Sequence, residues 1–230
     1  DIKGSVNKEG VYKVINGTRV FDLIKTAGGL KKDANTRFIN LSKILNDFEP
    51  ISLKEMDSVE LMNRVDAKYI MPVSFLPELI KNVSGKYRVL EINLLRQFNY
   101  NTVYFDTPDF LFFYQHLTGK LGRYKVRLRT YETTSISYLE VKYKSNKGRT
   151  SKTRIKREKG QSYHDEKSHK FLTEKVNADI DSLRPVITSL FTRITLVNLA
   201  SAERITLDYN MGYINNDGDR IELPYLAIVE

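Results

Sequence analysis

The segment from residue 120 to residue 160 alternates charged and apolar side chains with a period of two. In Lys125-Val126-Arg127-Leu128-Arg129 the cations occupy every second position, and residues 139–144 and 152–156 repeat this pattern. Because successive side chains of a strand point to opposite faces, each segment would place its cations on one face and its apolar side chains on the other. Turn-like residues 145–148 separate the last two segments. The pattern predicts successive antiparallel strands that share a cationic face.

The same period of two recurs at residues 64–68, 204–208 and 226–230, and Arg193 leads another β-branched run. Further strands are expected around residues 68–70 and 100–106. Short helices are expected at residues 19–26, 52–56, 73–83 and 110–117. Ser52-Leu53-Lys54-Glu55 has the spacing of a capping box, and Gly28 and Gly29 are expected to end the first helix. The chain is therefore expected to be an α+β protein in which helices cover the apolar outside of the strands.

Two interpretations of the cationic face remain open. It could be the solvated side of a half-buried sheet, which is the usual meaning of an alternating strand. Like charges on neighbouring strands repel, however, by about 4 kcal/mol for a pair at ~4 Å and an effective dielectric constant of about 20. A sheet that closes around a channel filled with anions would relieve this repulsion and would also remove the sheet edges.

Composition narrows the class of protein. With 230 residues, of which 41% are hydrophobic and 28% charged, the chain is too apolar for a disordered tail and is long enough for one large domain or two small ones. The absence of cysteine excludes disulfides, thiolate metal sites and cysteine nucleophiles. No apolar run approaches the roughly 18 residues that a membrane-spanning helix needs. Because the first residue is Asp1 and no signal-peptide pattern follows it, we expect a piece of a longer protein.

The formal charge of +9 is concentrated in one place. Residues 120–160 hold 14 Lys and Arg against three acids, whereas the rest of the chain holds 23 basic and 25 acidic residues. A block of this kind attracts a polyanion, which could be nucleic acid, anionic lipid, a nucleotide or a phosphate chain.

Residues 1–47 form a segment with its own sequence motifs. These motifs are Gly4-Ser5-Val6, Gly10-Val11-Tyr12, Ala27-Gly28-Gly29-Leu30 and Ile39-Asn40-Leu41. They resemble the soluble-ligand-binding β-grasp (SLBB) module, especially the copy in ComEA-type competence proteins. That module normally finishes with an apolar strand, whereas this chain continues directly into Phe48-Glu49-Pro50, so a truncated β-grasp unit is expected. The resemblance implies a protein or ligand partner for this segment.

Residues 48–230 carry a second set of ordered motifs. The set comprises Phe48-Glu49-Pro50-Ile51-Ser52-Leu53, Asn63-Arg64-Val65-Asp66-Ala67-Lys68-Tyr69, Val103-Tyr104-Phe105-Asp106-Thr107, Lys125-Val126-Arg127-Leu128-Arg129, Leu139-Glu140-Val141-Lys142 and Glu203-Arg204-Ile205-Thr206-Leu207-Asp208. Together they resemble the VTC domain, the polyphosphate polymerase domain of the vacuolar transporter chaperone and its bacterial relatives. This resemblance implies a triphosphate tunnel metalloenzyme (CYTH-like) fold, an antiparallel β tunnel of about eight strands with flanking helices.

The resemblance also implies roles for individual residues. The tunnel-wall cations that would bind a triphosphate and a phosphate chain are Lys68, Arg127, Arg129, Lys142, Lys152, Arg154, Arg193 and Arg204. Of these, Lys68, Arg127, Arg129, Lys142, Arg193 and Arg204 match the catalytic positions. Glu230 matches the glutamate that holds Mn²⁺ or Mg²⁺. Asp208 and Glu140 are weaker candidates, for charge balance or metal support, with Asp208 as the weaker metal ligand.

The implied activity is transfer of the terminal phosphoryl group of ATP onto polyphosphate, and the use of ATP implies the cytoplasm. Such a transfer needs positioning and charge neutralisation more than a covalent nucleophile. Arg64-Val65-Asp66-Ala67-Lys68 stands where triphosphatase relatives carry Glu-x-Glu-x-Lys, which argues against hydrolysis of tripolyphosphate or thiamine triphosphate. The family continues beyond the Glu230 strand with a further Lys and helical sequence, so a tunnel without its C-terminal end is expected.

Three alternatives to the enzyme stay open. One is a polyphosphate binder without activity, and another is a scaffold in which the β-grasp unit recruits a partner. The third is a nucleic-acid-binding module, supported by Tyr124, Tyr131, Tyr138 and Tyr143 among the cations. Against the third, Tyr131 and Tyr143 are expected on the apolar faces of their strands, under helices. His116, His164 and His169 lack ligand-like spacing.

Overall fold

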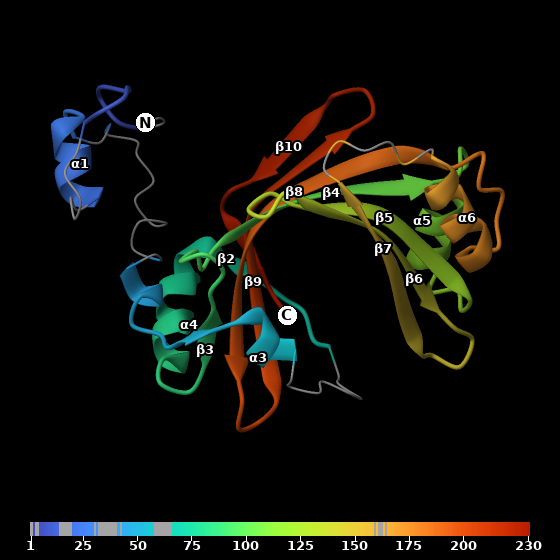
Figure 1. Ribbon diagram of the computed structural model, residues 1–230, viewed down its shortest axis with the longest axis horizontal. Helices are drawn as coiled ribbons and strands as arrows, with labels where there is room; N and C mark the ends of the chain where they lie inside the picture. The colour runs from blue at the N-terminus through green and yellow to red at the C-terminus, as the bar shows by residue number, and fades with distance from the viewer. Residues whose placement is uncertain are drawn as a thin grey trace. The chain divides into compact units, whose positions relative to one another are not determined.

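The computed structural model describes residues 2, 5–13, 20–29, 31, 41, 43–57, 66–158, 160, 163 and 165–230 (Figure 1). Parts of the sequence motifs, including Gly4, Ile39, Asn40 and residues 63–65, lie outside this range. By its internal contacts the chain separates into two compact units, Asp1–Asp47 and Phe48–Glu230.

In the first unit, an antiparallel bridge joins Ile2 and Gly10, and helix α1 spans Val20–Thr26. The predicted glycine end of this helix is confirmed. Gly28 and Gly29 have φ angles of 76° and 83°, and the Gly29 amide donates a hydrogen bond of 2.9 Å to the Ile24 carbonyl. Glycine adopts such left-handed angles without steric cost, which lets the helix end within one turn.

In its described residues, the second unit is built on an 11-stranded sheet whose main path runs β2-β11-β9-β8-β4-β5-β6-β7. The strands of this path are β2 (Tyr69–Pro72), β4 (Phe98–Asp106), β5 (Arg123–Tyr131), β6 (Ile136–Lys144), β7 (Thr150–Glu158), β8 (Arg184–Asn198), β9 (Glu203–Asn215) and β11 (Leu226–Val229). Every neighbouring pair along it is antiparallel. The expected antiparallel sheet of about eight strands is confirmed. In Figure 1 this sheet is strongly arched, an architecture consistent with a tunnel.

Three short strands extend the sheet, namely β1 (Pro50–Ile51), β3 (Arg88–Leu90) and β10 (Arg220–Leu223). The helices in the described part of this unit are α3 (Leu53–Asp57), η1 (Val73–Phe75), α4 (Leu76–Val83), α5 (Leu111–Leu117) and α6 (Glu166–Lys175). The capping box of α3 is confirmed, because the Ser52 amide donates to the Glu55 carboxylate and the Glu55 amide donates to Ser52 Oγ. Within the described residues, no helix is both long enough and apolar enough to cross a bilayer.

Helix α6 is not among the helices expected from the sequence. Its start is marked by Asp165, whose carboxylate accepts a hydrogen bond of 2.8 Å from the Ser168 amide. Such an N-cap satisfies an amide that has no partner within the helix. The helix buries Phe171 and Leu172, which lie near its middle.

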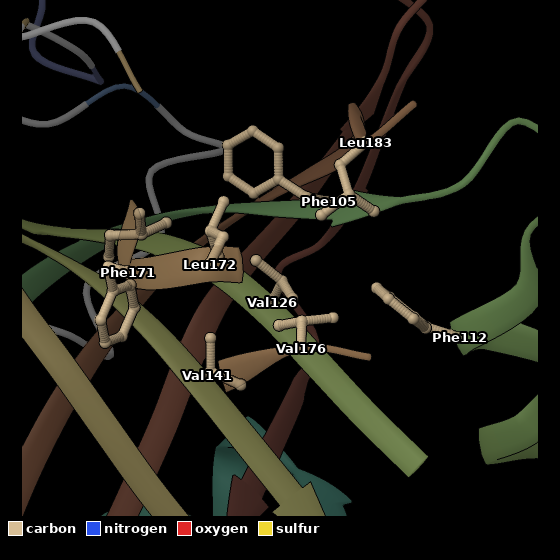
Figure 2. Packing of buried hydrophobic residues seen from close by; sticks show 9 residues of the cluster. Phe105, Phe112, Val126, Val141, Phe171, Leu172, Val176 and Leu183 are labelled. Carbon is tan, nitrogen blue, oxygen red and sulfur yellow. The ribbon is translucent and has the colours of Figure 1, made fainter. Parts of the chain in front are cut away.

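The hydrophobic core of the second unit lies between the sheet and helices α5 and α6. Figure 2 shows Phe105, Val126 and Val141 from three neighbouring strands meeting Phe112 of α5 and Phe171 of α6. Burying each such side chain contributes roughly 1.5–3 kcal/mol. This contact confirms that helices cover the apolar face of the alternating strands, so the cationic side chains are left on the opposite face.

A second apolar cluster lies on the cationic side of the sheet, at one end of the strands. Phe98 pairs with Arg193, and Val197 lies four residues further along β8, so both share the face of Arg193. Ile51 and Leu90 complete the cluster, and Met56 of α3 packs against it. The cationic face is therefore apolar and covered at this end.

One buried carboxylate joins β4 to α5. Asp106 Oδ1 accepts hydrogen bonds of 2.8 Å from the amides of Thr107 and Phe112, and its Oδ2 accepts one of 2.8 Å from Phe113. We expect Asp106→Ala to lower the free energy of unfolding by about 2–3 kcal/mol, because buried amides would lose their acceptor. Urea unfolding followed by tyrosine fluorescence measures this change.

The exposed Asp57 at the end of α3 provides the control. Asp57→Ala should change the free energy of unfolding by less than about 0.5 kcal/mol. Equal stability of the two variants would show that Asp106 does not anchor α5.

Candidate functional site

The registers of β5, β6 and β7 place the predicted cations in rows on one face. Lys125, Lys142 and Lys152 are directly opposite one another across the three strands. The next row holds Arg127 and Glu140, followed by Arg154. Opposed residues of antiparallel strands point to the same side of the sheet, so these rows form a continuous cationic surface.

Glu140 is completely buried at the centre of this surface. Its Oε2 accepts a hydrogen bond of 2.7 Å from Arg127 Nε and lies 2.7 Å from Arg127 Nη2, and its Oε1 lies 2.5 Å from Lys152 Nζ. Burial alone would raise the pKa of Glu140, but Arg127 and Lys152 outweigh it and lower the pKa below its usual value. The carboxylate therefore stays ionised and holds both cations in place.

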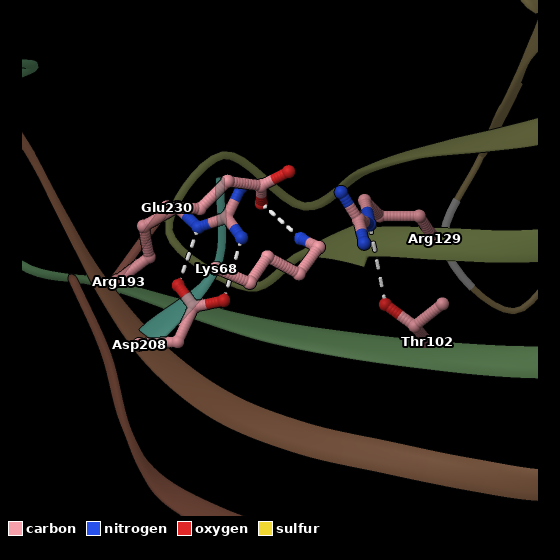
Figure 3. Close-up of polar contacts among 6 residues, drawn as sticks. All are labelled: Lys68, Thr102, Arg129, Arg193, Asp208 and Glu230. Carbon is pink, nitrogen blue, oxygen red and sulfur yellow. Dashed lines mark hydrogen bonds and ion pairs between the residues drawn. The ribbon is translucent and has the colours of Figure 1, made fainter. Parts of the chain in front are cut away.

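Across the arch, four residues of β8, β9 and the segments beside β2 and β11 form two ion pairs (Figure 3). Arg193 donates to both oxygens of Asp208, at 2.5 and 2.6 Å. Lys68 Nζ lies 2.6 Å from Glu230 Oε2. Burial opposes ionisation of Glu230, but Lys68 and then Arg193 lower its pKa. Each pair joins one cation to one carboxylate, so its net charge is close to zero.

Arg129 and Lys142 differ from the paired cations. Within the part of the chain that the structure describes, neither has a carboxylate at ion-pair distance, and Arg129 donates only one side-chain hydrogen bond, of 3.2 Å, to Thr102 Oγ1 (Figure 3). Arg129 is 8% exposed. Burial, followed by the charge of Arg127, lowers the pKa of both groups, that of Lys142 to about 8. A buried or partly buried cation without a carboxylate at ion-pair distance is unfavourable, so Arg129 and Lys142 favour a bound anion.

Two neighbouring residues respond to the same excess of positive charge. Burial, with the charges of Arg127 and Arg123, lowers the pKa of Lys125. The pKa of Tyr104 is lowered as well, because the cations, Arg127 first, outweigh the opposite effect of burial. Neither residue was among the predicted site residues, although Lys125 begins the alternating run that revealed the face. Tyr104 could be found only from its register opposite Arg127.

An aromatic pair orients two of the guanidinium groups. The rings of Tyr100 and Phe191 stack with centroids 5.0 Å apart and planes 7° apart. The guanidinium carbons of Arg129 and Arg193 lie 5.3–5.8 Å from the two ring centroids. Cation–π attraction in this range restricts the arginine side chains without using their hydrogen-bond donors. The stacking of Tyr100 on Phe191 joins β4 to β8, and no local sequence pattern predicts it.

The expectation for Tyr131 is wrong. Tyr131 is two residues after Arg129, so it lies on the cationic face, where it is opposite Tyr100 with ring centroids 5.0 Å apart. The expectation for Tyr143 holds, since its ring packs against Tyr124, which borders the core under the helices. One argument against nucleic acid, that both tyrosines lie under helices, therefore applies to Tyr143 alone.

The predicted cations are not all gathered in one place. The structure brings together Lys68, Arg127, Arg129, Lys142, Lys152 and Arg193. Arg154 is exposed, and its guanidinium lies over the Tyr138 ring at 4.4 Å from the centroid. Arg204 shares the face but is opposite Val197, a member of the apolar end cluster. It therefore lies at the covered end of the strands.

Of the two carboxylates Asp208 and Glu230, one has an oxygen that can serve as a ligand for a divalent metal. The described residues contain no group of three or more acidic or histidine side chains that could enclose an ion. Both oxygens of Asp208 are occupied by Arg193, whereas Glu230 is bound to Lys68 through Oε2. Mg²⁺ is commonly held by one or two carboxylates together with phosphate oxygens of the substrate. Glu230 fits this arrangement better than Asp208 does.

The N-terminal unit is similar to known β-grasp sequences. Residues 1–51 match the SLBB domain. Over 47 residues, 20% of this chain, the sequence is 45% identical to ComE operon protein 1 of Bacillus subtilis, and it spans 23% of the length of that protein.

Two solved structures are similar to part of the chain at low sequence identity. A Vibrio parahaemolyticus protein named as a candidate adenylate cyclase has a TM-score of 0.42 and 15% identity, over 71% of this chain and 73% of its own. A Hippeastrum protein, named as a candidate adenylyl cyclase with a dominant triphosphatase activity, has a TM-score of 0.34 and 12% identity, over 59% of this chain and 66% of its own.

The second unit carries the most extensive match to a sequence family. Residues 63–226, most of the unit that contains the arched sheet and the cationic face, match the VTC domain. The motifs that suggested this resemblance include the strands that carry Arg127, Arg129 and Lys142. The chain therefore belongs to the VTC domain family.

Proposed function

We propose that this chain is a polyphosphate polymerase-type phosphotransferase that moves the terminal phosphoryl group of ATP onto a polyphosphate chain on the cationic face. The observation that carries the proposal is the positive charge of the buried Arg129 and the partly buried Lys142, neither of which has a described carboxylate at ion-pair distance. Several phosphates in a row would supply that negative charge. Membership of the VTC domain family supports the same substrate class.

In this reaction an oxygen of the terminal phosphate of the chain attacks the γ-phosphorus of ATP. The bond from that phosphorus to the β–γ bridging oxygen breaks, and ADP leaves with the electron pair. Charge spreads over the oxygens of the transferred group, so fixed cations stabilise the transition state. Arg129 offers a planar guanidinium that can bind two oxygens, while Lys142 supplies a point charge.

The paired residues hold this arrangement in place. Glu140 fixes Arg127 and Lys152, and Asp208 fixes Arg193, so the cations lose little freedom when the substrate binds. Mn²⁺ or Mg²⁺, held by Glu230 together with phosphate oxygens, would supply further neutralisation of charge. The use of ATP places the reaction in the cytoplasm, and the SLBB unit would bind a protein or ligand partner.

A second candidate function is a polyanion binder without activity, for polyphosphate or single-stranded nucleic acid. It is favoured by the pairing of Asp208, Glu140 and Glu230 with cations, which leaves few oxygens for a metal. Tyr131 on the cationic face adds an aromatic side chain that could stack on a base.

Arg129→Gln tests the enzyme directly. Arg127 is less suitable, because its loss would leave the buried Glu140 without one of its counter-charges. The purified chain is incubated with ATP and Mn²⁺ or Mg²⁺, with and without a short polyphosphate primer, and chain growth and ADP release are measured. We expect metal-dependent growth that falls by roughly 10²-fold or more in Arg129→Gln.

Arg220→Gln, an exposed arginine paired with Glu222, should leave the rate unchanged. A wild-type rate in Arg129→Gln would contradict the proposed role of the cationic face. No turnover, combined with tight and salt-sensitive binding of polyphosphate, would establish the second candidate in place of the enzyme.

The pH dependence of binding gives a separate prediction. The pKa of Lys142 is about 8, and only its protonated form attracts an anion. The affinity for tripolyphosphate should therefore fall by roughly 10- to 30-fold between about pH 7 and pH 9.5, as the free protein loses this charge. Calorimetric titration at constant ionic strength measures this fall.

Lys142→Arg keeps its charge over the whole range, so its affinity should fall less steeply. Lys125 also titrates early and would account for the remaining slope. Identical pH profiles for the wild type and Lys142→Arg would contradict the role of Lys142.

A further inference from the structure

The cationic rows do not stop at Lys142. Lys144 is two residues further along β6, on the same face, and lies opposite Arg123 at the start of β5. Two residues of a strand span about 7 Å, so this pair forms the next row outward from the central cluster of cations around Arg129 and Lys142. Arg123 is held there by hydrogen bonds from Nη1 to the carbonyls of Gly119 and Lys120, at 3.2 and 2.7 Å.

The turn between β6 and β7 adds two more cations, Lys147 and Arg149, both exposed. Its backbone is well defined, since the Ser145 amide donates to the Arg149 carbonyl at 2.8 Å and the Gly148 amide donates to the Ser145 carbonyl at 3.0 Å. Gly148 has a φ angle of 77°, which glycine adopts without strain. The cations of the turn are therefore held close to the end of the rows.

The sequence segments that carry these cations contain no acidic residue. The sequence has no Asp or Glu between Asp109 and Glu132, and none between Glu140 and Glu158. Among the described side chains, none of Lys144, Lys147 and Arg149 has a carboxylate at ion-pair distance. A surface that only solvates a sheet usually mixes both signs of charge, whereas this one carries a single sign.

The opposite end of the same face is apolar. There Phe98 and Val197 are buried together with Ile51 and Leu90, and Met56 packs against them. Arg204 is the predicted cation on the face at this end, and it lies among apolar side chains, where phosphate groups would lose their hydration. A phosphate chain longer than the central cluster can therefore extend favourably in one direction, toward the turn between β6 and β7.

We propose that Arg123, Lys144, Lys147 and Arg149 form an outer subsite for the distal phosphates of a linear polyphosphate. The subsite rests on the proposed function, since it extends the cluster around Arg129 and Lys142. It would make affinity increase with chain length and would guide the chain out at this end. Nucleic acid fits it less well, because residues 144–150 contain no aromatic side chain and Tyr143 packs against Tyr124 on the other face.

The test compares a short and a long ligand, tripolyphosphate and long-chain polyphosphate. The triple variant Lys144→Gln, Lys147→Gln and Arg149→Gln removes three charges of the subsite. We expect its affinity for the long chain to fall about tenfold or more at low salt, and the slope of log affinity against log salt to decrease by about 2–3. Its affinity for tripolyphosphate should stay within about twofold, since that ligand fits within the central cluster.

The matched control is Lys167→Gln, Lys170→Gln and Lys175→Gln. These exposed lysines belong to α6, which packs on the opposite face of the sheet, and the variant carries the same change of charge. Its affinity for the long chain should remain near that of the wild type.

The inference would be overturned if both ligands lost affinity equally in the subsite variant, or if the control variant lost as much. It would also be overturned if single-stranded DNA competed as well as polyphosphate, since the surface would then be a nucleic-acid site. Failure of the wild type to bind tripolyphosphate, with binding of the long chain still sensitive to the subsite variant, would refute the proposed function alone.

Discussion

The burial of Glu140 between Arg127 and Lys152 is the interaction on which the cationic face depends. An isolated buried carboxylate would be strongly unfavourable, and so would the buried Arg127 without a counter-charge beside Lys152. Together the three groups satisfy one another and fix their positions on β5, β6 and β7. One carboxylate against two cations leaves this group with a net positive charge, and Arg129, Lys142 and Lys125 add further cations beside it. This excess of positive charge is the basis of the proposed anion binding.

The alternation along the strands separates two tasks that would otherwise conflict. Val126 and Val141 pack under α5 and α6 and stabilise the sheet, while Arg127 and Lys142 at the neighbouring positions are free of that packing. The helices thus supply the stability that the repelling cations cannot supply themselves. At the far end of the strands the apolar cluster around Phe98 takes the place of the charges, so the two ends of the cationic face differ in character.

Local patterns account for much of this architecture and long-range pairing for the rest. The alternation in residues 125–129 is enough to predict a strand with one cationic face, and the motif at Ser52 is enough to predict α3. The position of Tyr131 on the cationic face follows from the same count of two, which the expectation for that residue overlooked.

Other features depend on which strands become neighbours. The pairing of Arg193 with Asp208 requires the register of β8 and β9, and the stacking of Tyr100 on Phe191 requires that of β4 and β8. A sequence period cannot supply these registers. The second apolar cluster could not be predicted from the sequence for a similar reason, because Phe98 and Val197 come from strands far apart in the sequence.

A crystal structure of the chain with bound tripolyphosphate would test the central claim most directly. The account predicts phosphate oxygens at hydrogen-bond distance from Arg129 and Lys142, inside the arch of the sheet, with the ion pairs of Glu140 intact. Tripolyphosphate bound only outside the arch, with the Arg129 and Lys142 side chains unchanged and without an anion, would contradict it.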